Sequence, residues 1–146
     1  FQGEELGLSD VTNIQFDKMK DPWGLNFYPE FLGRDTCRTP MVWEKNKPMG
    51  GFTSANESWL PISELHMEKA GLDMAKSEGS IYKKFSSFLK WRRKQPAMIS
   101  SNKMSELSGG PSEIIFDRES ETQILRCKFD FKLVEATFEE VTYGTS

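Results

Sequence analysis

The clearest hydrophobic pattern in the chain is an apolar stripe at helical spacing between residues 80 and 95. Its members recur at i, i+4, i+7 and i+8, and they are Ile81, Phe85, Phe88 and Leu89. Ser80 precedes the stripe as a suitable N-cap. Pro96 disfavours helical backbone at Gln95 and so limits the helix. The pattern predicts one helix over residues 80–95.

The chain after residue 98 shows the period of two that is typical of strands. Between residues 123 and 131 the apolar side chains alternate with Arg126, Lys128 and Asp130. Further strands are predicted at 113–118 and 134–143, and the short polar turns between them favour antiparallel pairing. We therefore expect a small β-region and a boundary near residues 96–104.

Residues 9–78 show little regular periodicity, apart from a possible helical turn or two within 11–19. Five prolines interrupt this segment, which is also rich in Trp, Phe and Gly. Residues 64–78 are polar and suit a surface loop with one helical turn. Long loops in compact domains are uncommon and usually functional, so we expect this one to fold over a site.

Composition and charge narrow the function. A length of 146 residues corresponds to one ordinary domain, and a net charge of −3 argues against a nucleic-acid partner. No apolar run reaches membrane-spanning length, so no membrane partner is expected. The three consecutive basic residues at 92–94 suit the C-terminal end of a helix dipole rather than a nucleic-acid patch.

The cysteine and histidine content predicts neither a metal site nor a cofactor. Cys37 and Cys127 stand far apart without CxxC spacing, which favours free thiols in a reducing compartment. No signal peptide is visible, although the chain begins at Phe1 and not at Met. We therefore expect a cytoplasmic location. His66 is the sole histidine and has no partner motif, so a Ser/His or Cys/His catalytic pair is not predicted.

The densest candidate chemistry lies between residues 33 and 43, where two arginines, an aspartate and a tryptophan occur close together. Guanidinium groups beside planar aromatic faces suit a ligand with hydroxyls and C–H faces, such as a sugar. The alternative is structural: Arg34 and Asp35 pair with each other or with local carbonyls, and Trp43 is part of the core.

A series of motifs in one order resembles the C-terminal part of bacterial α-glucosidases and oligo-1,6-glucosidases of the α-amylase family of glycoside hydrolases. The motifs are FQGEELGL (1–8), DPWG (21–24), FYPEF (27–31), GRDTCRTPMVW (33–43), GFT (51–53) and WLP (59–61). The resemblance extends over about residues 1–98, and the combination is far more specific than any one motif.

The resemblance implies an α+β fragment of a (β/α)8 barrel. Residues 1–3 correspond to the end of the last strand, residues 4–78 to the loop after it, and residues 80–95 to the last helix. Residues 1–97 are then the end of the catalytic barrel, and residues 98–146 part of a small antiparallel β C-terminal domain. Barrel active sites lie in the loops that follow the strands.

The resemblance also implies site residues. Arg38 matches the arginine that holds hydroxyls of the non-reducing-end glucose, and Arg34 and Asp35 match a preceding pair expected to act as a scaffold by mutual charge. Glu4 and Trp43 are expected in the pocket wall. These five residues are the predicted substrate-binding set, and the predicted ligand is an α-linked oligosaccharide or glucose.

No catalytic residue is predicted within the chain. Family members use an aspartate nucleophile and a glutamate acid/base on strands that precede Phe1, and a retaining mechanism needs two carboxylates about 5–5.5 Å apart. Glu4 and Glu5 are adjacent, and neighbours in extended backbone point to opposite faces.

We therefore predict part of a retaining α-glucosidase for short oligosaccharides, which needs the N-terminal barrel portion as its partner and is inactive alone. The alternative is a non-catalytic carbohydrate-binding or interaction module, which would use exposed aromatics around Trp23, Phe27 and Trp43, or a relic without activity. Uncovered apolar surface would make such an isolated chain prone to self-association.

Overall fold

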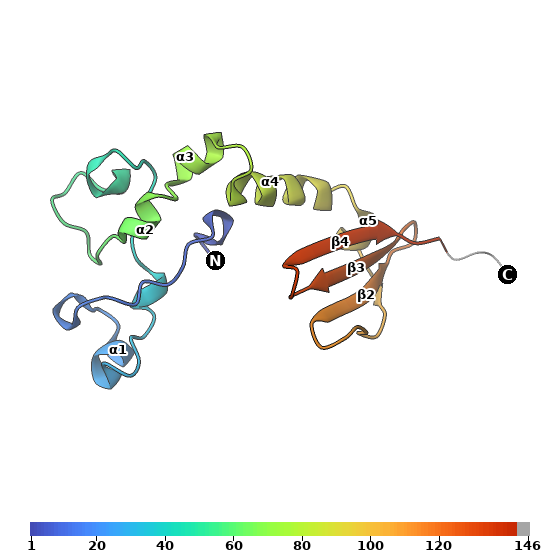
Figure 1. Ribbon diagram of the computed structural model, residues 1–146, viewed down its shortest axis with the longest axis horizontal. Helices are drawn as coiled ribbons and strands as arrows, with labels where there is room; N and C mark the ends of the chain where they lie inside the picture. Colours follow the sequence, from blue (N-terminus) through green and yellow to red (C-terminus); the bar gives the residue numbers. More distant parts are fainter. Residues whose placement is uncertain (143–146) are drawn as a thin grey trace. The chain divides into compact units, whose positions relative to one another are not determined.

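A computed structural model describes residues 1–142 (Figure 1). The chain divides into two compact units, the first Phe1–Ser86 and the second beginning at Ser87. This division falls inside the helix α4 (Ile81–Arg92). The boundary predicted between residues 97 and 98 is a different one, because it separates the barrel from the C-terminal domain of a longer protein. It stays a prediction. Within residues 1–142 no helix has both the length and the apolar character needed to cross a membrane.

The first unit consists of short helical turns joined by extended backbone. Its α-helices are α1 (Pro22–Phe27), α2 (Glu64–Met67) and α3 (Gly71–Lys76). Its 3-10 helices are η1 (Glu4–Leu6), η2 (Phe16–Lys18), η3 (Asp35–Cys37) and η4 (Pro48–Gly51). The described strands all lie in the second unit, so the predicted end of a barrel strand at residues 1–3 stays a prediction.

Two local predictions for the first unit need correction. Residues 64–78 were predicted as a loop with one helical turn, but they contain the two helices α2 and α3. Backbone hydrogen bonds form α3 although its sequence is polar. Glu4 and Glu5, treated as extended neighbours, lie in the tight turn η1 between the left-handed glycines Gly3 (φ 101°) and Gly7 (φ 64°).

The first unit is held together by a small core and by bonds between distant segments. Val11, Ile14 and Met19 form a buried cluster with Leu32 packed against it. The backbone N–H of Val11 donates to the carbonyl of Thr36 at 2.9 Å. The segment that seemed structureless in sequence is thus fixed by long-range contacts that no local pattern encodes.

The second unit is an antiparallel sheet in the order β1-β2-β3-β4. The strands are β1 (Lys103–Met104), β2 (Glu113–Glu119), β3 (Ile124–Asp130) and β4 (Glu135–Glu140). The predicted antiparallel strands are confirmed, with β2 one residue longer and β3 and β4 shorter than predicted. Tyr143, at the end of the last predicted strand, lies outside the described residues. The strand β1 was not predicted, since its two residues carry no detectable period.

The predicted helix is confirmed, and it is shorter than expected. Ser80 caps it, as its Oγ accepts from the backbone N–H of Lys83 at 3.2 Å. The helix ends at Arg92, and Pro96 begins a separate short helix, α5 (Pro96–Ile99). In the second unit Trp91 packs against Phe138, with ring centroids 4.9 Å apart, beside a buried cluster that includes Leu125 and Cys127.

Candidate functional site

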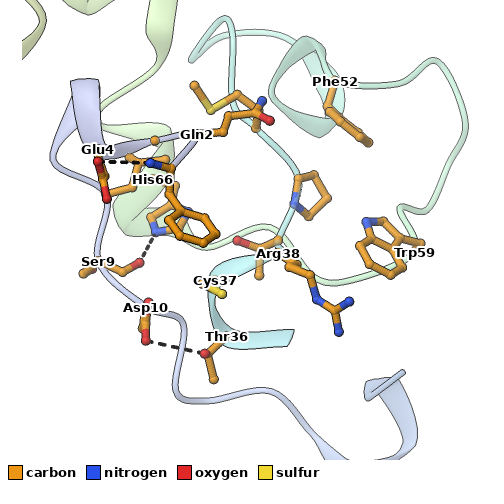
Figure 2. A pocket seen from close by; sticks show the side chains of 16 residues that line it. Gln2, Glu4, Ser9, Asp10, Thr36, Cys37, Arg38, Phe52, Trp59 and His66 are labelled. Atoms are coloured by element: carbon orange, nitrogen blue, oxygen red, sulfur yellow. Dashed lines mark hydrogen bonds and ion pairs between the residues drawn. The ribbon is translucent and has the colours of Figure 1, made fainter. Parts of the chain in front are cut away.

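A pocket of about 700 Å³ lies within the first unit, between the start of the chain and the segment around η3. Figure 2 shows Phe52 and Trp59 on one side of it, Ser9 and His66 on the other, and Arg38 between them. Two aromatic rings and a guanidinium thus face one space. This combination can bind a flat, hydroxylated ligand by ring stacking and by donated hydrogen bonds.

Arg38 is the strongest hydrogen-bond donor of this pocket. Its Nε donates to the carbonyl of Arg34 at 3.2 Å, and its Nη2 donates to Oδ1 of Asp35 at 3.2 Å. Its Nη1 makes no hydrogen bond within residues 1–142, and the side chain is 41% exposed. The guanidinium is therefore held on one edge and free to donate on the other.

Two fully buried carboxylates lie behind Arg38. Asp35 is 0% exposed, and its Oδ2 accepts from the backbone N–H groups of Lys20 at 2.5 Å and Asp21 at 2.7 Å. Asp21 is 1% exposed, and its Oδ2 accepts from the backbone N–H of Arg34 at 2.6 Å. The same oxygen lies 3.7 Å from Nη2 of Arg38. The carboxylates thus join two chain segments, 20–21 and 34–38, around one guanidinium.

The surroundings of Asp21 favour its ionised form. The backbone N–H of Arg34 lowers the pKa of Asp21, and further contacts with Arg34 and Trp23 outweigh the opposing effect of burial. Asp21 also caps α1, since Oδ1 accepts from the N–H of Trp23 at 3.4 Å. Gly33 permits this arrangement: at φ 66° it has no side chain, and a Cβ there would lie 2.5 Å from Oδ2 of Asp21.

The structure brings only part of the predicted substrate-binding set to the pocket. Arg38 and Glu4 line it, whereas Arg34, Asp35 and Trp43 do not. Trp43 lies against Gly71 at the start of α3, where a Cβ would be 3.4 Å from its ring. The substrate-binding roles of all five residues stay predictions.

The expected mutual pairing of Arg34 and Asp35 is replaced by pairs with other residues. Nε of Arg34 lies 3.5 Å from Oδ2 of Asp21, and Asp35 pairs with Arg38. The reason is geometric: η3 places Asp35 and Arg38 three residues apart on one side, while Arg34 precedes the turn and reaches the start of α1. The scaffold role expected of Arg34 and Asp35 stays a prediction.

His66 is a further pocket residue that the sequence did not indicate as part of a site. It is 4% exposed, and its Nε2 lies 2.8 Å from the carbonyl oxygen of Ser9. A carbonyl only accepts, so Nε2 carries the proton and Nδ1 is an acceptor. Within residues 1–142, Nδ1 is buried without a partner. Nothing in its polar sequence neighbourhood predicted this burial.

Trp59 and Phe52 were likewise missed as site residues, although the aromatic richness of the segment was the available signal. They are 50% and 43% exposed. Trp23 and Phe27, which the alternative prediction used, are exposed too, with ring centroids 6.0 Å apart, and they lie outside the pocket lining.

The described residues offer little for metal or thiol chemistry. No group of three or more His, Cys, Asp or Glu side chains in residues 1–142 is arranged to hold a metal ion. Both cysteines are free, as expected, with Cys37 exposed and Cys127 buried.

Sequence comparisons show which known proteins this chain is similar to. The family model for the alpha-amylase catalytic domain matches residues 1–101. A probable alpha-glucosidase of Rhizobium meliloti (strain 1021) is 43% identical over 98 residues, which cover 67% of this chain and 17% of the relative. An oligo-1,6-glucosidase of Halalkalibacterium halodurans is 25% identical over 147 residues, which cover 88% of this chain and 26% of the relative.

Solved structures with a similar fold include two enzymes. The alpha-glucosyl transfer enzyme XgtA aligns with a TM-score of 0.83 and 35% identity, over 89% of this chain and 24% of that enzyme. The trehalose-6-phosphate hydrolase of Bacillus licheniformis aligns with a TM-score of 0.75 and 20% identity, over 89% and 26%. The chain thus spans about a quarter or less of these proteins.

Proposed function

The chain belongs to the alpha-amylase family, and we propose that it is the C-terminal part of a longer parent enzyme that hydrolyses α-glucosidic bonds of short oligosaccharides with retention. In this proposal residues 1–97 complete the catalytic barrel, and the pocket around Arg38 becomes one wall of the glucose site. The catalytic carboxylates come from the portion of the parent that precedes this chain.

The observation that carries the proposal is the state of Arg38. Its guanidinium is fixed on one edge by Asp35 and by the carbonyl of Arg34, and its Nη1 is unengaged within the described residues. A guanidinium in this state can donate to the hydroxyls of a sugar without reorganising. Trp59 supplies an apolar face in the same pocket.

The test has two arms, the parent enzyme and the isolated 146-residue chain. With p-nitrophenyl α-glucoside as substrate, we expect the parent to release glucose first as the α-anomer, which proton NMR detects before mutarotation. The isolated chain should show no turnover. Release of the β-anomer would contradict retention, and turnover by the isolated chain would contradict the location of the carboxylates.

A second candidate function is α-glucosyl transfer to an acceptor other than water. It is favoured by the likeness to XgtA, an alpha-glucosyl transfer enzyme, at 35% identity. Both reactions use the same glucose pocket, so Arg38 has the same role in each. Product analysis of the parent with maltose separates them: hydrolysis gives two glucose molecules per maltose and no new glucoside, whereas transfer frees one glucose for each longer or rearranged glucoside formed.

A further inference from the structure

The two buried carboxylates beside Arg38 make more hydrogen bonds than are needed to close a loop. A loop can be closed by backbone bonds alone, whereas burying two carboxylates carries a desolvation penalty that is offset only by several donors. Asp35 uses Oδ2 for two backbone N–H groups and Oδ1 for Arg38. Each oxygen therefore has a separate task.

We propose that Asp35, supported by Asp21, is a positioning residue that fixes the orientation of the Arg38 guanidinium toward the sugar. This inference rests on the proposed sugar-binding role of Arg38. Arg38 reaches the pocket on a long side chain that would otherwise sample several rotamers. Restricting it to one rotamer when the ligand binds would cost free energy. Oδ1 of Asp35 and Oδ2 of Asp21 lie 3.2 Å and 3.7 Å from Nη2, so this ordering is complete before the ligand arrives.

The bonding of Asp35 allows a substitution that separates its two tasks. In Asp35→Asn the amide oxygen can still accept from the N–H groups of Lys20 and Asp21, which keeps the loop closed. The amide nitrogen then faces Arg38 and cannot accept from it. The variant thus releases the guanidinium while it preserves the connection between the two backbone segments.

The first measurement follows the Arg38 guanidinium directly by nitrogen-15 NMR of the arginine Nε–H groups in the 146-residue chain. In the wild type we expect a slowly exchanging, motionally restricted Arg38 signal. In Asp35→Asn this signal should shift and become mobile. The signal of Arg126, which pairs with Asp117 at 2.9 Å in the second unit, should not change. An Arg38 signal that is equally restricted in both proteins would overturn the proposal.

The second measurement is a double-mutant cycle on kcat/KM in the parent enzyme. Arg38→Ala should lower kcat/KM about 10- to 100-fold, as expected for losing a charged donor to a sugar hydroxyl. Asp35→Asn should lower it about 5- to 10-fold, chiefly through KM, since ordering of one long side chain is then lost. The double variant should be no worse than Arg38→Ala, because Asp35 acts through Arg38.

The outcomes separate this inference from the proposed function. If Arg38→Ala leaves kcat/KM unchanged, the sugar-binding role itself fails. If Arg38→Ala is impaired while Asp35→Asn is not, or if the two losses multiply in the double variant, only the positioning role fails. Asp73→Asn is the matched control, because Asp73 also accepts a backbone N–H, from Lys45 at 3.1 Å, outside the pocket, and it should behave as wild type.

A folding defect in Asp35→Asn would show in the NMR spectrum as loss of signals throughout the first unit. Asp21→Asn then serves as the second variant. It removes the more distant carboxylate charge and leaves Oδ1 of Asp35 in place, so we expect a smaller, KM-directed loss of about 2- to 5-fold. No loss in this variant together with an unaltered Arg38 signal would contradict the support assigned to Asp21.

Discussion

At the scale of single residues, the charge of Asp21 makes the stability of the first unit depend on pH. The N–H of Arg34 lowers the pKa of this buried carboxyl below its ordinary value of 3.8. A depressed folded-state pKa contributes stability above the unfolded value, and this stability is lost as pH falls through the folded pKa. We therefore expect the wild type to lose stability below about pH 4.

Comparison with Asp21→Asn isolates this effect in urea unfolding between pH 6 and pH 3. The variant should be less stable than wild type at pH 6, and the difference should shrink as pH falls below about 4, where the carboxyl of the unfolded chain takes up a proton before that of the folded chain. Asp73→Asn, at an exposed position, reports the effect of removing one surface charge. A difference between wild type and Asp21→Asn that is constant with pH would show that the charge of Asp21 is not involved.

The two cysteines should differ sharply in reactivity. Burial raises the pKa of the Cys127 thiol, while Cys37 is exposed beside the pocket. The thiolate is the reactive form, so titration with a disulfide reagent at pH 8 should detect one fast thiol, and a second after unfolding in urea. Cys37→Ser should abolish the fast phase. A fast phase that persists in this variant would contradict the burial of Cys127.

Residue-level prediction from sequence succeeded where chemistry was visible and failed where burial decided the role. Arg38 could be selected because its motif resembles that of a known family, and it does line the pocket. The burial of Asp21 and His66 could not be predicted, because it arises from contacts between segments far apart in sequence. The same holds for the partners of Arg34 and Asp35.

At the scale of elements, the turn at Gly33 determines whether the carboxylate of Asp21 can approach the backbone N–H of Arg34. Its φ of 66° is unfavourable for other residues, and a Cβ would also lie 2.8 Å from the backbone N of Gly24. Gly33→Ala should therefore destabilise the first unit by about 2 kcal/mol or more, from strain and from the clash with Asp21.

Gly79→Ala is the matched control for this turn, and urea unfolding measures both variants. Gly79 has a similar φ of 76°, but a Cβ there would meet nothing within 4 Å. Only backbone strain of about 1 kcal/mol is then expected. Equal losses in the two variants would indicate that the approach of Asp21 to Gly33 contributes nothing.

In the second unit aromatic side chains of α4 pack against the buried cluster of the sheet. Trp91 is half-buried and lies near Phe88 and Phe138, at centroid distances of 5.7 Å and 4.9 Å. Trp91→Ala should lower the free energy of unfolding by about 2 kcal/mol, less than the roughly 3–5 kcal/mol of a fully buried aromatic, because Trp91 is only half-buried. Phe131→Ala, at a 64% exposed position, should cost under about 0.5 kcal/mol. Similar midpoints in urea for both variants would contradict this assignment.

Elements could be predicted from sequence wherever local periodicity was strong. The stripe around Phe88 predicted α4, and the alternation around Cys127 predicted β3. The helices α2 and α3 were missed because they are short and polar, and because α3 also bonds to a distant segment. Leu72 of α3, for example, donates its N–H to the carbonyl of Trp43 at 2.9 Å.

At the scale of the whole molecule, the proposed function makes this chain a part that acts with a preceding barrel portion. It spans 17% of the Rhizobium meliloti relative, and its pocket contains a fixed arginine and aromatic faces. Glu5 accepts a hydrogen bond from the backbone N–H of Gly3 at 2.9 Å. Under the proposed function the catalytic carboxylates come from the preceding portion of the parent.

The central claim is that Arg38 binds the sugar, and it is tested most directly by kcat/KM of the parent enzyme for p-nitrophenyl α-glucoside in wild type, Arg38→Ala and Arg93→Ala. Arg93 is exposed and lies outside the pocket. We predict a loss of about 10- to 100-fold for Arg38→Ala, measured at a temperature where the variant is folded, and no loss for Arg93→Ala. Wild-type kcat/KM in a folded Arg38→Ala enzyme would contradict the account.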